Sequence, residues 1–188
     1  ELVSHGIEPM ITLYHWDLPQ ALQDKYKGWE SREIIDDFVS YSKVCFENFS
    51  DRVKYWIVMN EPNIFTALGY QLKLHPPGVS DEALYLKTFH HTALAHALTV
   101  LAYKEAGYDG KIGSSIAYTP SYAETDKPAD IKAKVMFDAT GPLWYLDGYY
   151  KGRYPEEGFS YFTNKGVMPV VTEADINVMV QAATLCDF

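Results

Sequence analysis

A short apolar run that ends in the polar triplet Asn60-Glu61-Pro62 most constrains how this chain can fold. Residues 53–59 are apolar, β-branched or aromatic except for Lys54, which is the composition of a buried strand. Pro62 has no N–H for a strand ladder and disfavours the helical region for the residue before it, so we expect the strand to stop with Glu61 still extended. Apolar neighbours favour the protonated form of a carboxyl group, and a general acid needs that form near neutral pH.

A second polar cluster follows another apolar run upstream. Residues 8–14 have the composition of a buried strand, and they lead into His15-Trp16-Asp17-Leu18-Pro19. A lone glutamate after a strand is more often a solvated loop carboxylate than a catalytic group. Two such clusters, each at the end of an apolar strand, favour a functional site instead.

The segment between these strands has the pattern of a helix. Its apolar stripe recurs at spacings of three and four residues, and Ser31 precedes it as a cap. The stripe consists of Ile34, Phe38, Tyr41, Cys45 and Phe49. A strand–helix–strand unit predicts two parallel strands. The two polar clusters should therefore meet at one edge of the sheet, where barrels and doubly wound sheets place their sites.

The two clusters together resemble glycoside hydrolase family 1, which includes β-glucosidases and 6-phospho-β-glycosidases. The motifs are His15-Trp16-Asp17-Leu18-Pro19 and Trp56-x-x-x-Asn60-Glu61-Pro62. Further likeness lies at Gly28-Trp29, His75-Pro76-Pro77-Gly78, His90-His91 and Gly152-x-Tyr154-Pro155. The resemblance implies an α/β fold, the (β/α)₈ TIM barrel. It also implies an enzyme that hydrolyses β-glycosides with retention of the anomeric configuration. It implies that Glu61 is the general acid/base, that His15, Trp16 and Asn60 bind the sugar, and that no cofactor or metal is needed.

The length predicts that this barrel is incomplete. The chain has 188 residues, whereas a full (β/α)₈ barrel typically needs about 250. We therefore expect residues 1–188 to be a single partial barrel domain, truncated at both ends, that covers the third to fifth strands. The resemblance implies a nucleophile on the seventh strand, beyond Phe188. The open sheet edges should meet the rest of the barrel or a second copy, and Met10, Ile57 and Met59 should face the barrel interior.

Composition excludes several classes of partner. The formal charge is −9, and the 16 basic residues are scattered among 25 acidic ones, which disfavours binding to nucleic acid or to an anionic membrane. No apolar stretch reaches the roughly 18 residues of a membrane span. Cys45 and Cys186 have no metal or redox spacing, so we expect a reducing cytoplasm.

A metal site is not expected at the three histidines His90, His91 and His96. Adjacent helical residues point in different directions, and His91 and His96 are not separated by three or four residues, the spacing that places side chains on one helix face. We expect His90 or His91 to be buried and hydrogen-bonded, facing the strand that carries Glu61.

The remaining pattern predicts helices over residues 81–106 and 126–148, a strand over 111–118, and a helix from the Thr172/Asp175 capping box to about residue 184. Residues 62–78 show no clean period and read as a pocket-shaping loop. Its aromatic residues Phe65 and Tyr70 either line that pocket or pack the loop. Another aromatic set is either a sugar platform or part of the core: Phe137, Trp144, Tyr145, Tyr149 and Tyr150.

Two other functions also fit parts of this sequence. A non-catalytic carbohydrate-binding relative would share the fold but lack one of the two carboxylates. An aldolase-type barrel would need a lysine at a strand end, and none of these strands ends in lysine. The sequence does not decide whether the sugar carries a 6-phosphate.

Overall fold

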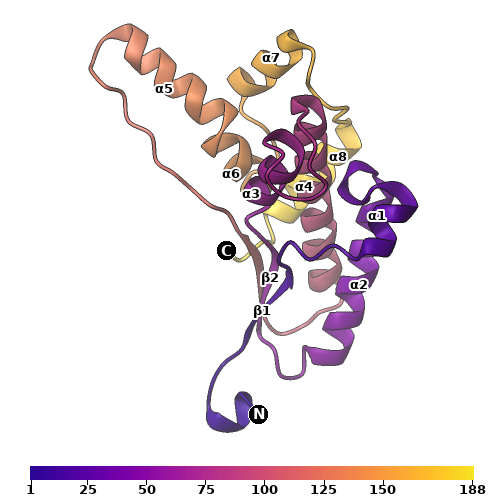
Figure 1. Ribbon diagram of the computed structural model, residues 1–188. Coiled ribbons are helices and arrows are strands. Elements are labelled where there is room, and N and C mark those ends of the chain that lie inside the picture. Colours follow the sequence, from indigo (N-terminus) through magenta and orange to yellow (C-terminus); the bar gives the residue numbers. More distant parts are fainter.

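Three parallel strands form the centre of the structure, a computed structural model that describes residues 1–188. They lie in the order β1 (Met10–Tyr14), β2 (Tyr55–Asn60) and β3 (Lys111–Ser115), and a long helix occurs in each connection, α2 (Glu33–Phe49) and α4 (Glu82–Glu105). The predicted strand–helix–strand units are confirmed, so the carboxyl ends of all three strands point the same way (Figure 1). The other helical segments are η1 (Val3–His5), α1 (Gln20–Tyr26), η2 (Gly28–Glu30), α3 (Pro62–Thr66), η3 (Ala67–Gln71), α5 (Pro128–Thr140), α6 (Pro142–Tyr150), α7 (Glu156–Lys165) and α8 (Glu173–Ala183).

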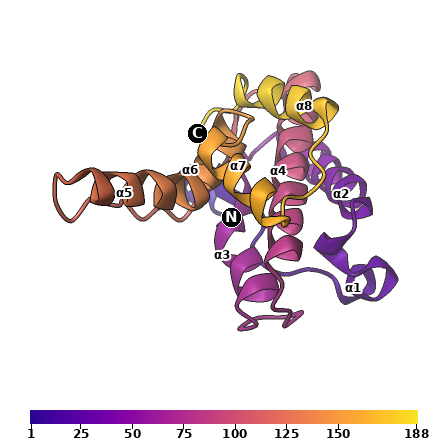
Figure 2. The same ribbon diagram turned by 90° about the horizontal axis from the view of Figure 1, so that it is seen from above.

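Helix α4 is the centre of the helical layer. It packs between α2 and α8 (Figure 2) and also contacts β2 and β3. Residues 88–97 are buried without interruption, so the helix is covered on all its sides rather than along one stripe. A helix whose side chains are apolar or hydrogen-bonded on every side belongs in the interior of a domain. No helix of the structure is long and apolar enough to cross a membrane.

The open face of the sheet matches the prediction only in part. Met10 is 52% exposed, as expected, and Ile57 is half-buried. The expectation for Met59 is wrong, because its side chain is fully buried and its Sδ lies 3.6 Å from the hydroxyl of Tyr149 on α6. The pairing of β2 with β3 is irregular between Ile57 and Asn60, the stretch that contains Met59.

Proline explains one wrong helix boundary. The helix predicted over residues 126–148 is two helices, α5 and α6, separated at Gly141. Pro142 lacks the N–H that a continuous helix would need, and its ring would clash with the preceding turn. Helix α5 and the extended segment before it project from the body as a long arm (Figures 1 and 2).

Three other predictions need correction. Residues 62–71 form α3 and the π-helical turn η3 instead of an irregular loop, and α7 was absent from the predicted elements. The proposed stripe on α2 is partly wrong, because Tyr41 and Phe49 are 48% and 45% exposed. The buried face of α2 consists instead of Ile34, Ile35, Phe38, Ser42 and Phe46.

The aromatic residues of α6 belong mainly to the core. Trp144 and Tyr149 are 1% and 2% exposed, and Trp144 stacks on Tyr154 with ring centres 4.1 Å apart. Such burial favours packing over a sugar platform for these two rings. Phe137, in contrast, lies on the projecting α5 and is 56% exposed.

A buried polar cluster joins α8 to α2 and α4. The predicted capping box is confirmed, since Thr172 and Asp175 exchange both hydrogen bonds at the start of α8. Asp175 is 2% exposed and accepts two hydrogen bonds from Arg32. His90 bridges the Asp175 carboxylate, at 3.3 Å, and the hydroxyl of Tyr154, at 2.9 Å. The cluster fixes α8 against the central helix.

The other two histidines also have separate partners. His91 Nδ1 lies 2.8 Å from the carbonyl oxygen of Trp29, and His96 Nδ1 lies 2.9 Å from the hydroxyl of Ser114 on β3. His90 and His91 are buried and hydrogen-bonded as predicted, but their partners lie outside β2, so the expectation that one of them faces the strand of Glu61 is wrong. His96 instead contacts the neighbouring strand β3. No group of three or more histidine, cysteine or acidic side chains is arranged to hold a metal ion.

Candidate active site

The predicted acid/base residue follows β2 in an unusual backbone conformation. Glu61 has φ 46° and ψ 56°, in the left-handed region, so the expectation of an extended Glu61 is wrong. Its N–H donates to the carbonyl oxygen of Ser115 at 2.7 Å, and its own carbonyl accepts the N–H groups of Ile64 and Phe65 at the start of α3. A residue before a proline normally adopts an extended conformation, so these contacts hold Glu61 against that preference. The backbone of Glu61 is therefore fixed from both sides, and its side chain is half-buried.

Trp16, at the end of β1, is also in the left-handed region, with φ 77°. Positive φ in residues other than glycine costs roughly 1–3 kcal/mol and occurs preferentially at functional sites. The Asp17 carboxylate accepts the N–H of His15 at 3.1 Å, which supports the turn after β1. Both strand ends that the sequence singled out thus carry a strained residue.

Hydrogen bonds bring the two strand ends together. Asn60 Nδ2 lies 3.1 Å from His15 Nε2, and the indole N–H of Trp16 donates to the carbonyl oxygen of Asn60 at 2.9 Å. His15 is exposed, whereas Trp16 and Asn60 are half-buried, so polar edges remain available at the end of the sheet. All four predicted residues, Glu61 included, lie along the carboxyl ends of β1 and β2.

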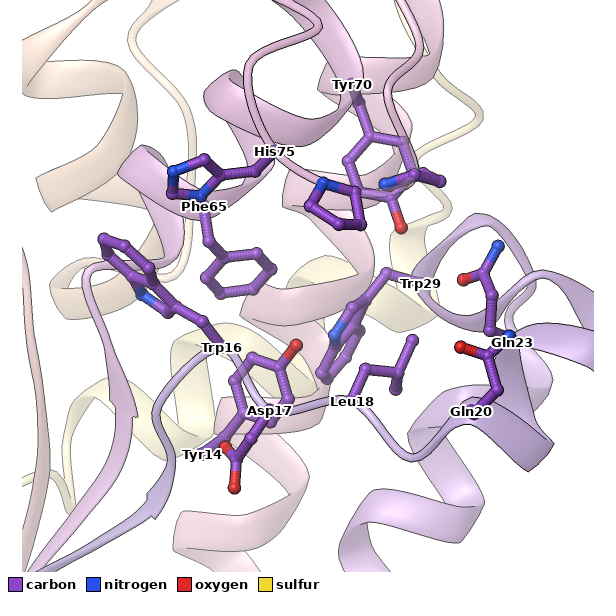
Figure 3. A pocket seen from close by; sticks show the side chains of 12 residues that line it. Tyr14, Trp16, Asp17, Leu18, Gln20, Gln23, Trp29, Phe65, Tyr70 and His75 are labelled. Atoms are coloured by element: carbon purple, nitrogen blue, oxygen red, sulfur yellow. The ribbon is translucent and has the colours of Figure 1, made fainter.

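A cavity of about 300 Å³ lies beside this cluster, and Trp16 is the only one of the four predicted site residues in its wall (Figure 3). Phe65 and Tyr70 are buried and also line this cavity. The two rings therefore both pack the segment after β2 and line the pocket. The remaining wall consists of Tyr14, Asp17, Leu18, Gln20, Gln23, Trp29, His75, Pro76 and Pro77.

The family is decided by comparison with known proteins. The model of Glycosyl hydrolase family 1 matches residues 1–188. The chain belongs to glycosyl hydrolase family 1. The aryl-phospho-β-D-glucosidase BglC of Bacillus subtilis is 42% identical over 95% of this chain and 38% of its own length. β-Glucosidase A of Acetivibrio thermocellus is 39% identical over 96% of the chain and 40% of its own length.

A solved structure extends the likeness to the fold. The crystal structure of a rice β-glucosidase superposes with a TM-score of 0.87 at 34% identity, covering 96% of this chain and 41% of the rice chain. The three strands and their helices are therefore a part of the (β/α)₈ barrel of family 1. The chain spans about two fifths of the length of these relatives.

In this family 1 chain, one neighbour of the site was not among the predicted binding residues. His75 packs against Trp16 with ring centres 5.6 Å apart, and the preceding π-helical turn carries the chain back to that position. Its motif, His75-Pro76-Pro77-Gly78, was noted in the sequence, but nothing in its spacing showed that it returns to the end of β1.

Proposed function

We propose that the full-length protein is a retaining β-glycosidase in which Glu61 is the general acid/base. The observation that carries the proposal is the contact between the ends of β1 and β2, where Asn60 joins His15 and Trp16 directly beside Glu61. A glycosidase needs a carboxyl group and sugar-binding polar groups at one place, and this edge of the sheet supplies both.

The mechanism uses two carboxyl groups. Glu61 protonates the oxygen of the leaving group while a second carboxylate, about 5 Å away and outside residues 1–188, attacks the anomeric carbon. Glu61 then removes a proton from the water that hydrolyses the glycosyl-enzyme, with retention of configuration. A glutamate-to-glutamine mutant of the rice β-glucosidase was crystallised in a covalent complex with Glc, which supports such an intermediate by analogy. Two carboxyl groups suffice for this chemistry.

The substrate class that we propose is β-glucosides or their 6-phosphates, since relatives of both kinds match the chain. Kinetics with 4-nitrophenyl β-glucoside and its 6-phosphate should show which form has the higher kcat/KM. Proton NMR of the early reaction should show the β-anomer of the released sugar before mutarotation. First appearance of the α-anomer would contradict retention, and sugar binding without any turnover would favour the non-catalytic alternative.

Asn60→Ala should lower kcat/KM by about 10²-fold in the full-length protein. The substitution removes an amide that contacts His15 Nε2 and that we assign to sugar binding, and single hydrogen-bonding groups that act on a transition state contribute about 10²–10³-fold. The matched control is Asn48→Ala, which removes an exposed asparagine on α2. Equal activities of the two variants would exclude Asn60 from the site.

A further inference from the structure

A β-bulge lies in β2 immediately before the acid/base residue. Ile57 pairs with Gly113, whereas Asn60 pairs with Ser115, so three steps along β2 match two steps along β3. In an unbroken register Asn60 would align with residue 116. A shift of one residue turns every following side chain to the opposite face of a sheet, and bulges near active sites re-aim side chains in this way. On its other side β2 keeps its register, since Met59 pairs with Tyr14 of β1, so the shift is confined to the pairing with β3.

Ser114 supports this bulge with its side chain. The N–H of Met59, one of the bulged residues, donates to the Ser114 hydroxyl oxygen at 3.2 Å. The hydroxyl lies 2.9 Å from Nδ1 of His96 on α4, and His96 Nε2 lies 3.9 Å from the Cys186 sulfur. Ser114 and His96 are 5% and 1% exposed, so water does not replace these partners readily.

The protonation of His96 fits this arrangement. Burial lowers the pKa of His96 to about 3, so the imidazole is neutral at neutral pH. Because the Ser114 oxygen already accepts the Met59 N–H, its own proton is free to be donated to Nδ1 of the imidazole. This arrangement is compatible with the tautomer in which Nε2 carries the proton and faces Cys186.

We propose that Ser114 and His96 are positioning residues for the acid/base Glu61, an inference that rests on the proposed function. The hydrogen-bonded pair holds the bulge, and the bulge places Asn60 beside Ser115. The Ser115 carbonyl then accepts the Glu61 N–H, which fixes the backbone that carries the carboxyl group. Neither Ser114 nor His96 touches the substrate.

The test is the dependence of kcat/KM on the leaving group in the full-length protein. Ser114→Ala leaves the Met59 N–H and His96 Nδ1 without their partner, so the bulge is free to slip. We expect kcat/KM for a methyl or alkyl β-glucoside to fall by about 10²-fold, the scale of a 1 Å displacement of a catalytic group. For 2,4-dinitrophenyl β-glucoside, which needs little protonation, the fall should be less than about threefold. The 6-phosphates replace these substrates if the enzyme prefers them.

Two further variants separate positioning from folding. Ser114→Thr keeps the hydroxyl and should restore the wild-type ratio between the two substrates. Thr99→Val removes a fully buried hydroxyl of α4 whose oxygen has no hydrogen-bond partner, and it should leave the ratio unchanged. A variant that merely reduces the folded fraction lowers both rates equally, so an unchanged ratio in Ser114→Ala would overturn the inference. The ratio in Glu61→Gln is the reference: if it too is unchanged, the proposed function itself fails.

Discussion

Glu61→Gln is expected to lower kcat/KM for alkyl β-glucosides by about 10²–10⁴-fold, the usual contribution of a general acid. Glutamine has nearly the same shape as glutamate but cannot donate a proton to the leaving oxygen. The fall should be much smaller for 2,4-dinitrophenyl β-glucoside, because its leaving group departs as a stable anion. Steady-state kinetics of the full-length protein with both substrates measures this difference.

The second half-reaction gives an independent measurement on the same variant. Hydrolysis of the glycosyl-enzyme needs Glu61 as a base, so kcat for the activated substrate should fall and the intermediate should accumulate. Azide needs no base, and its addition should restore turnover and yield the β-glucosyl azide. Glu105→Gln, at the exposed end of α4, is the matched control and should behave as the wild type. Equal losses on both substrates without rescue by azide would contradict the assignment of Glu61.

The ends of β1 and β2 were predictable because local chemistry determines them, whereas the strand predicted over residues 111–118 ends already at Ser115. Pro62 terminates β2 whatever surrounds it, and an apolar run of strand length has few alternatives to a buried strand. The same holds for the capping box of Thr172 and Asp175, which needs only residues three apart. Parallel strands then place both motifs at one edge, so the predicted residues His15, Trp16, Asn60 and Glu61 do lie together.

The details that depend on tertiary pairing were not predictable from the sequence. Strict alternation along β2 places Met59 on the open face, and only the Ser114 hydroxyl of another strand shows why the register shifts there. The backbone of Glu61 takes its left-handed conformation between the Ser115 carbonyl and the first turn of α3, two contacts that local sequence does not specify. The site is therefore predicted at the level of which residues meet, whereas their orientation is set by neighbouring strands.

The largest effect on stability is expected at Asp175, remote from the catalytic edge. Asp175→Ala should lower the free energy of unfolding by about 1.5–3 kcal/mol, the contribution of hydrogen bonds to a charged group, because the remaining Arg32 is half-exposed and can be hydrated. The substitution leaves His90 Nε2 without its acceptor, breaks the capping box with Thr172, and removes both acceptors of Arg32. Denaturant unfolding of the full-length protein at pH 7 measures the change.

The pH dependence distinguishes this ionic contribution from lost packing. Burial alone would raise the pKa of Asp175, but hydrogen bonds from Arg32, Thr172 and His90 outweigh burial and hold the pKa well below its usual range. A carboxyl group with a depressed pKa stabilises the fold above its unfolded pKa of about 4, and this stabilisation is lost as the pH falls through the folded value. The difference in unfolding free energy between wild type and Asp175→Ala should thus be constant from pH 7 to about 5 and shrink below about 4.

Glu173→Ala, which removes an exposed acid in the same first turn, should lower the free energy of unfolding by less than about 1 kcal/mol. A difference for Asp175→Ala that stayed constant down to pH 2 would show that shape, rather than charge, makes this residue important.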